Sequence, residues 1–179
     1  STFMFGAGQD TSAKLLGNSM RYIVDTPGLQ QQLRDDRQLI PWMLEEVLRL
    51  EGSTKATHRV ARRDTHIGNV KVPAGKAVIV ALAAGNRDPR RWGEDASEFK
   101  LKRPGIREHI AFGRGAHTCA GAPLARAEVA TILNSFFDLT SDIAISEATH
   151  GKRGARRYQF EPSFIIRGLD NLHLELQGR

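Results

Sequence analysis

The segment from Phe112 to Gly121, FGRGAHTCAG, is the feature that most restricts what this chain can fold into. It contains the single cysteine of the chain, Cys119, and its glycines at 113 and 115 allow a sharply turned backbone. The residues that follow predict the start of a helix with a proline in its first turn. A thiol at the N-terminal end of a helix is biased toward the thiolate form. Because the neighbouring residues are small and leave a flat surface, this pattern favours axial ligation of a haem iron.

A lone cysteine is more often a small buried hydrophobic residue than a ligand, so the surrounding pattern decides its meaning. The segment matches F-G-x-G-x-H-x-C-x-G at every specified position, which are Phe112, Gly113, Gly115, His117, Cys119 and Gly121. It resembles the cysteine-ligand signature of the haem-thiolate monooxygenases, the cytochromes P-450, and the next helix looks like that of soluble bacterial members. The resemblance implies haem b as the cofactor, Cys119 as the axial ligand of its iron, and the other matched residues as cofactor contacts.

A second motif, AGQDT, begins at Ala7 within the predicted helix 2–25. A glycine inside a helix costs about 1 kcal/mol relative to alanine, and the Thr11 hydroxyl can bond the Ala7 carbonyl and bend the helix. In isolation, such small residues usually reflect packing. The segment resembles the family's distal-helix motif A-G-x-D-T, which implies that Asp10 and Thr11 help to deliver protons to dioxygen.

A third motif is a pair of opposite charges in a strongly apolar predicted helix, residues 38–50. Glu46 falls within the apolar stripe, and Arg49 can pair with it from three residues further on. An exposed pair of this spacing contributes about 0–1 kcal/mol, whereas a buried pair needs further partners. The pair resembles the family's E-x-x-R motif, which implies that Arg103 completes a structural network that fixes the loop presenting Cys119.

Residues 55–81 have the β-branched pattern of short strands, which we expect at 57–61, 70–72 and 77–81. Arg59 lies in the first of them, where it is either an exposed strand arginine or a partner for a carboxylate. The resemblance favours a two-point bond from Arg59 to a haem propionate. His117 would ordinarily be a solvated loop histidine, and the resemblance implies that it is the other propionate contact.

The remaining segments have weaker patterns. Residues 28–37 predict a short helix, 90–108 an irregular connection, and 121–137 a core helix that backs the haem. Residues 147–157 are polar and basic and predict an exposed loop. Residues 160–176 alternate as in a terminal hairpin, and the resemblance implies that Ile165 and Ile166 near its tip contact substrate.

The chain of 179 residues suits a single domain, and the expected architecture is mainly α with small β-sheets (α+β). Measured against the resembled family, residues 1–179 correspond to the C-terminal, haem-ligating portion of an incomplete cytochrome P-450 fold. We therefore expect a fragment without the N-terminal part, or one part of a split protein with a separate N-terminal half. We also expect a cytoplasmic protein with no membrane span in this chain, because no apolar run approaches the necessary length.

The net charge of +6 is compatible with nucleic acid, an anionic membrane, an acidic protein partner, or simply a solvated basic surface. A nucleic-acid module is disfavoured because the sequence lacks a recognition motif and an aromatic stacking platform. The resemblance implies an electron donor of the ferredoxin or flavodoxin type, with docking expected at Lys55, Arg62, Arg63 and Arg114. It also implies dioxygen and a small, lipophilic organic substrate that is hydroxylated or otherwise oxidised. The alternative is a truncated, non-enzymatic haem-binding or interaction module.

Overall fold

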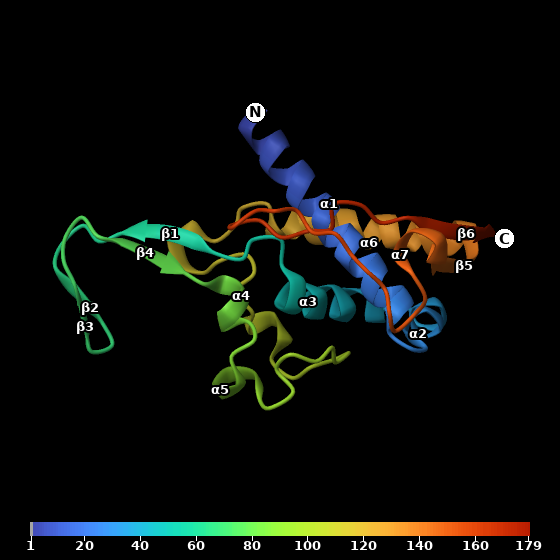
Figure 1. Ribbon diagram of the computed structural model, residues 1–179, viewed down its shortest axis with the longest axis horizontal. Helices are drawn as coiled ribbons and strands as arrows, with labels where there is room; N and C mark the ends of the chain where they lie inside the picture. Colours follow the sequence, from blue (N-terminus) through green and yellow to red (C-terminus); the bar gives the residue numbers. More distant parts are fainter. Residues whose placement is uncertain (1) are drawn as a thin grey trace.

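Three long helices form the body of the protein. The computed structural model describes residues 2–179, with side chains from residue 6 onward. Helices α1 (Thr2–Asp25), α3 (Leu39–Glu51) and α6 (Ala122–Leu139) pack against one another, and the short α2 (Leu29–Asp35) connects the first two (Figure 1). Each of these four helices lies where the sequence predicts one.

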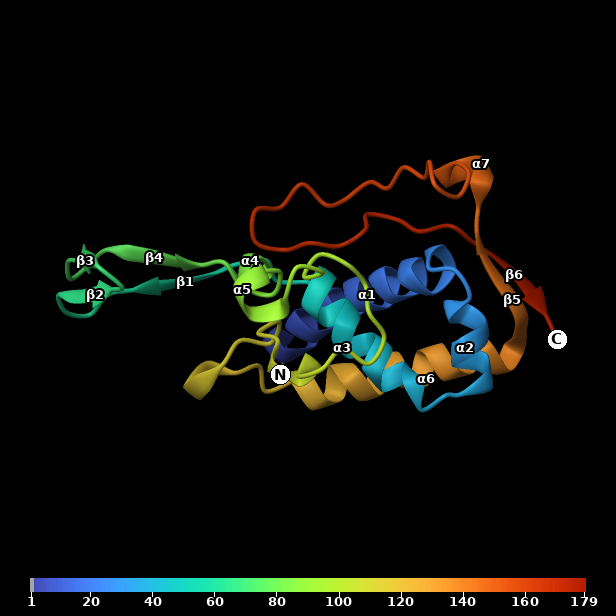
Figure 2. The ribbon, with the colours of Figure 1, turned by 90° about the horizontal axis from the view of Figure 1, so that it is seen from below.

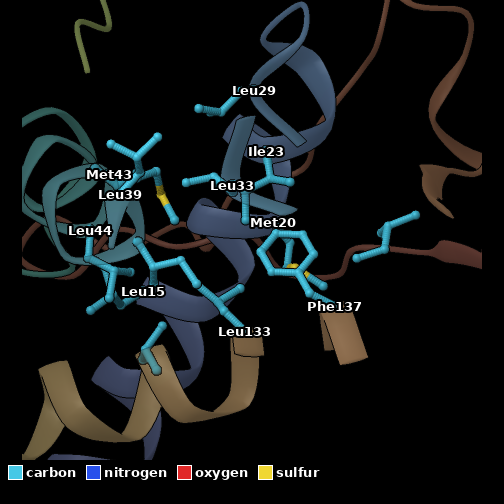
Figure 3. Close-up of a cluster of buried hydrophobic side chains, with 14 of the residues drawn as sticks. Leu15, Met20, Ile23, Leu29, Leu33, Leu39, Met43, Leu44, Leu133 and Phe137 are labelled. Atoms are coloured by element: carbon cyan, nitrogen blue, oxygen red, sulfur yellow. The ribbon is translucent and has the colours of Figure 1, made fainter. Parts of the chain in front are cut away.

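An apolar cluster fills the space between these helices. Figure 3 shows its side chains converging from α1, α2, α3 and α6. Its members are almost fully excluded from solvent and include Leu15, Met20, Ile23, Leu33, Met43, Leu44, Leu133 and Phe137. Burying a side chain of this size stabilises the fold by about 1.5–3 kcal/mol, so the cluster fixes the helix arrangement on which the site is built.

Local chemistry sets the boundaries between the helices. After α1, the Thr26–Pro27 step interrupts the helix, and Gly28 takes a φ of +73°, a left-handed conformation that glycine adopts without strain. Before α3, the carboxylate of Asp36 accepts a hydrogen bond from the amide of Gln38 over 3.0 Å. That amide would otherwise be one of the unpaired donors at the start of the helix.

Three antiparallel two-stranded sheets complete the regular structure. They pair β1 (Thr57–Val60) with β4 (Ala77–Val80), β2 (Thr65–Ile67) with β3 (Val70–Val72), and β5 (Thr140–Ile145) with β6 (Leu174–Gly178). The β1–β4 ribbon projects from the helical body and carries β2 and β3 at its far end (Figure 1). Gly68, with a φ of +57°, allows the tight turn between β2 and β3.

The predicted terminal hairpin is wrong in its pairing. Phe160 and Leu169 form only an isolated bridge, and β6 pairs instead with β5, a strand that the sequence analysis missed. Between them, the chain runs as a long loop back along the helical body (Figure 2). Alternation within 160–176 suggested a local partner, but the alternation of a strand does not identify which strand it pairs with.

The predicted exposed loop at 147–157 is also partly wrong. It begins with the helical turn α7 (Glu147–His150), and the His150 side chain is buried. Its Nε2 accepts a hydrogen bond from the amide of His173 over 3.0 Å, which ties the turn to the chain leading into β6. The segment 90–108 is irregular as predicted, apart from the short α5 (Pro89–Trp92) and the 3-10 turn η1 (Ile106–Glu108).

The architecture confirms the expected class, mainly helical with small sheets. A further short helix, α4 (Leu82–Gly85), joins β4 to the irregular segment. Within residues 2–179, no helix combines the length and apolarity needed to cross a membrane.

Candidate functional site

The segment 112–121 forms a turned loop that ends where α6 begins. Gly113 and Gly115 have φ angles of +71° and +83°, a region that side chains other than glycine rarely adopt. The 3-10 turn η2 (Gly115–His117) follows, and the Cys119 amide donates to the Phe112 carbonyl oxygen over 2.9 Å. This bond closes the loop and leaves the Cys119 thiol exposed.

Cys119 lines a pocket with a volume of about 250 Å³. Thr11 of α1, Arg59 of β1 and His117 of the loop line the same pocket. Much of the remaining wall is apolar and comprises Ala7, Leu15, Leu48, Leu82, Ala111, Phe112 and Ala125. The structure therefore brings together, around one cavity, residues that the sequence analysis selected from three distant segments.

The three glycines of the predicted motif differ in their position relative to the pocket. Gly113 lines the pocket, whereas Gly115 and Gly121 are not among its lining residues. A Cβ atom at Gly121 would have the Cys119 sulfur 3.8 Å away, an ordinary van der Waals contact. Gly121 thus lies beside the thiol without being sterically required there.

Thr11 makes the hydrogen bond that the sequence predicts. Its hydroxyl donates to the Ala7 carbonyl oxygen over 2.9 Å, the helix-bending bond expected from the sequence. In addition, the Ser53 hydroxyl donates to the Thr11 carbonyl oxygen over 2.8 Å. Ser53 also lines the pocket, and the sequence analysis did not identify it.

Asp10, unlike Thr11, does not line the pocket. Its carboxylate is exposed and pairs with Lys14, one turn along α1. Lys14 also binds Glu161 over 2.8 Å, so the ammonium group links α1 to the long C-terminal loop. Burial opposes the charge on Lys14, but the hydrogen bonds to Asp10 and Glu161 outweigh it and raise the pKa of Lys14.

The two candidate propionate partners are both exposed at the pocket. The Arg59 guanidinium donates to the Thr57 hydroxyl over 3.0 Å and to the His58 carbonyl oxygen over 2.8 Å, both on its own strand. These two bonds use a single nitrogen, Nη1, so the guanidinium retains donors for a carboxylate.

Ile165 and Ile166 are not among the residues that line the pocket. The Ile165 carbonyl oxygen accepts from the Lys55 amide over 2.7 Å, and Ile166 forms a bridge with Thr54. Thr54 lines the pocket, whereas the Ile165 side chain is exposed to solvent. The Lys55 ammonium is also engaged, because it donates to the Ser163 carbonyl oxygen over 2.6 Å.

Glu46, Arg49 and Arg103 form a network inside the protein. The Arg49 Nε and Nη2 atoms bind the two Glu46 oxygens over 2.9 and 2.7 Å, and Arg103 Nε binds Glu46 Oε1 over 3.0 Å. Glu46 and Arg49 are fully excluded from solvent. The two guanidinium groups also donate to backbone carbonyl oxygens of the chain that follows α4, at Asn86, Trp92, Asp95, Ala96 and Glu98.

A second network, which the sequence analysis missed, is centred on the preceding residue, Glu45, which is buried. Its Oε2 lies 2.8 Å from Nε2 of His109, and Arg126 binds both of its oxygens over 2.5 and 3.0 Å. His109 lies just before the cysteine loop and Arg126 just after it. The available signal was a second glutamate in the same apolar helix, which the motif did not include.

The environment of Glu45 keeps it ionised. Burial alone would raise the pKa of this carboxyl group, but the hydrogen bonds from His109 and Arg126 outweigh burial and lower the pKa to about 2. The Ala111 amide donates to Nδ1 of His109, so the ring proton lies on Nε2 and faces Glu45.

Comparisons with known proteins agree on one family. The family model described as cytochrome P-450 matches residues 1–138. A curated relative from Mycobacterium tuberculosis, the cytochrome P-450 numbered 140, is 39% identical over 170 residues, which cover 95% of this chain and 36% of the relative.

Two solved structures are similar over nearly the whole chain. The substrate-free cytochrome P-450 CYP150A6 of Mycobacterium marinum is 48% identical with a TM-score of 0.96, covering 99% of this chain and 43% of that chain. CYP109E1 of Bacillus megaterium, solved in complex with corticosterone, is 29% identical with a TM-score of 0.85, covering 96% of this chain and 44% of that one. The chain therefore spans less than half the length of these relatives.

Replacing Glu46 with glutamine should lower the free energy of unfolding by about 3–5 kcal/mol, because the fully buried Arg49 loses its only carboxylate partner among the described residues and Arg103 keeps only its pair with Asp95. Denaturant titration at neutral pH measures this change. The control is Asp138→Asn, which breaks the exposed pair between Asp138 and Arg37 and should cost about 0–1 kcal/mol. A loss no larger than that of the control would contradict a structural role for the network.

Replacing Glu45 with glutamine should destabilise the chain at neutral pH and have less effect in acid. Because the folded-state pKa is about 2 and the usual value is 4.5, the carboxylate contributes fully above about pH 4.5, and this contribution is lost as pH falls toward 2. Denaturant titrations across this range should show the difference between wild type and Glu45→Gln shrinking in acid. A difference that stays constant down to pH 2 would show that the charge of Glu45 is not responsible.

Proposed function

Because this chain belongs to the cytochrome P-450 family, we propose that residues 1–179 form the C-terminal, haem-ligating part of a monooxygenase domain. One observation carries the proposal: the exposed thiol of Cys119 lines the same pocket as Thr11, Arg59 and His117. The rest of the domain, from upstream sequence or from a separate N-terminal half, would supply the remaining walls of the substrate site.

The residues present fit haem b, the cofactor of this family. Cys119 offers an exposed sulfur from a loop closed by its own backbone amide, and cysteine sulfur is a known axial ligand of haem iron. The apolar wall suits the porphyrin face, while Arg59 and His117 offer donors for carboxylates. Bound haem supplies the activation of dioxygen, in which two electrons and two protons allow one oxygen atom to enter the substrate and the other to leave as water.

The chain's own residues would control the ligand and the protons. We assign Cys119 as the axial ligand and Arg59 and His117 as propionate contacts. The Thr11 hydroxyl donates to Ala7, so its oxygen lone pairs remain available to accept a hydrogen bond from within the pocket. Asp10 would relay protons from solvent toward Thr11, after its carboxylate leaves Lys14.

The substrate proposed is a small, lipophilic organic molecule. The apolar lining of the pocket supports this chemistry, as does the corticosterone bound by the Bacillus megaterium relative. The electron donor proposed is an acidic ferredoxin or flavodoxin. Arg62, Arg63 and Arg114 are exposed and basic, and Arg114 also donates to the Glu108 carbonyl oxygen over 3.1 Å. Lys55 is half-buried and donates to the Ser163 carbonyl oxygen, so it is a poorer candidate for docking.

Cys119→Ser should abolish the thiolate-type Soret band of the ferrous carbon monoxide complex of the haem-loaded chain, because it removes the sulfur ligand. A matched control adds Ser135→Cys to that variant, which restores an exposed thiol on α6 outside the pocket. The control should not restore the band. Absence of a thiolate-type band in the wild-type chain supplied with haem would contradict both the monooxygenase and the haem-binding module.

Replacing Arg114 and Arg62 together with glutamate should slow reduction of the haem-loaded chain by an acidic ferredoxin about tenfold or more at low salt, since electrostatic steering raises association rates by that order. Stopped-flow reduction at several salt concentrations measures the effect. Arg157→Glu makes the same type of charge change at another exposed arginine, beyond α7, and should leave the rate unchanged. An unchanged rate and salt dependence in the double variant would exclude this docking surface.

A further inference from the structure

We infer that Glu45 is a positioning residue for the Cys119 loop: it holds the chain entering the loop through His109 and the helix leaving it through Arg126. The inference concerns the placement of the thiol, and only its consequence for haem ligation rests on the proposed function. Glu45 itself does not line the pocket, so it acts through the residues it binds.

The entering side is held by the imidazole of His109. One ring nitrogen, Nε2, lies 2.8 Å from Glu45, and the other, Nδ1, accepts from the Ala111 amide over 3.2 Å. The ring therefore links a carboxylate on α3 directly to the backbone at the start of the loop. Gly52, just after α3, permits the close approach, since a Cβ atom there would lie 3.0 Å from the Cβ of Ala111.

The leaving side is held by the guanidinium of Arg126, on the second turn of α6. It binds both Glu45 oxygens, a two-point geometry that fixes orientation as well as distance. Its carbon also lies 4.6 Å from the centre of the Phe112 ring, within the range of a cation–π contact. The Phe112 carbonyl oxygen accepts a hydrogen bond from the Cys119 amide. A series of contacts therefore connects Glu45, through Arg126 and Phe112, to Cys119.

Glu51, at the end of the same helix, provides a comparison: it is a buried glutamate whose ion-pair partners lie outside the flanks of the cysteine loop. Glu51 is also buried and is bound by Arg21, Arg87 and Arg167. Those arginines belong to α1, to the segment after α4 and to the long C-terminal loop, and none lies in the 109–126 region. Glu51→Gln is therefore a matched control that removes a buried carboxylate without releasing the cysteine loop.

The first experiment needs no haem. Hydrogen–deuterium exchange of the 179-residue chain is followed by mass spectrometry on peptides spanning 109–121, for wild type, Glu45→Gln and Glu51→Gln. Glu45→Gln should exchange about tenfold faster in these peptides, because bonds to a charged group at both ends of the loop are lost. Glu51→Gln should exchange there like wild type. Equal exchange in Glu45→Gln and wild type, or equal acceleration in both variants, overturns the inference.

A conservative variant covers the case in which Glu45→Gln does not fold. Arg126→Lys keeps the positive charge but cannot make the two-point bond. The exchange rate of peptides 109–121 in Arg126→Lys should be measurably higher than in wild type but lower than in Glu45→Gln. Exchange identical to wild type in Arg126→Lys counts against the leaving side of the network and overturns the inference as stated.

The second experiment measures ligation in the haem-loaded chain. The fraction of the ferrous carbon monoxide complex with a thiolate-type Soret band should fall in Glu45→Gln and stay at the wild-type value in Glu51→Gln. An equal fraction in all three proteins overturns the link between Glu45 and the thiol. If wild type lacks the band, the proposed function fails, while the exchange experiment still decides whether Glu45 positions the loop.

Discussion

The buried carboxylate of Glu46 is the interaction on which the rest of the structure depends. The chain between α4 and η1 has little regular structure, so its carbonyl groups need donors from elsewhere. Arg49 and Arg103 provide those donors at several points of this segment. Glu46 supplies the negative charge for both guanidinium groups in the interior, and Asp95 supplies a second one for Arg103. An irregular segment thereby acquires a defined position relative to α3.

Helix α3 positions two separate segments because the side chains of its adjacent residues Glu45 and Glu46 point in different directions. Successive residues of a helix are rotated by about 100°, so Glu45 and Glu46 cannot face the same neighbour. Glu46 binds the arginines of the irregular segment, and Glu45 binds the two flanks of the cysteine loop. A single rigid element therefore sets the relative position of both, and the hydrophobic cluster beneath holds that element in place.

Patterns confined to one segment were predictable from the sequence, whereas contacts between distant segments were not. Helical periodicity located the four main helices, and the glycine spacing of 112–121 indicated its turned backbone. The pairing of β5 with β6 joins distant residues, from Ile145 with Leu174 to Thr140 with Gly178, and nothing in either strand specifies the other. Likewise, the motif that contains Asp10 does not reveal that Lys14 holds its carboxylate outside the pocket, because that depends on side-chain orientation.

The exposure of Cys119 also determines how the chain responds to oxidants. Residues 1–179 contain no second cysteine, so any disulfide that Cys119 forms joins it to a thiol outside these residues. Oxidation beyond the sulfenic acid is irreversible for most proteins and would convert the sulfur into a hard oxyacid. Either product would remove the thiol that we propose as the iron ligand, so a reducing environment would protect the Cys119 sulfur.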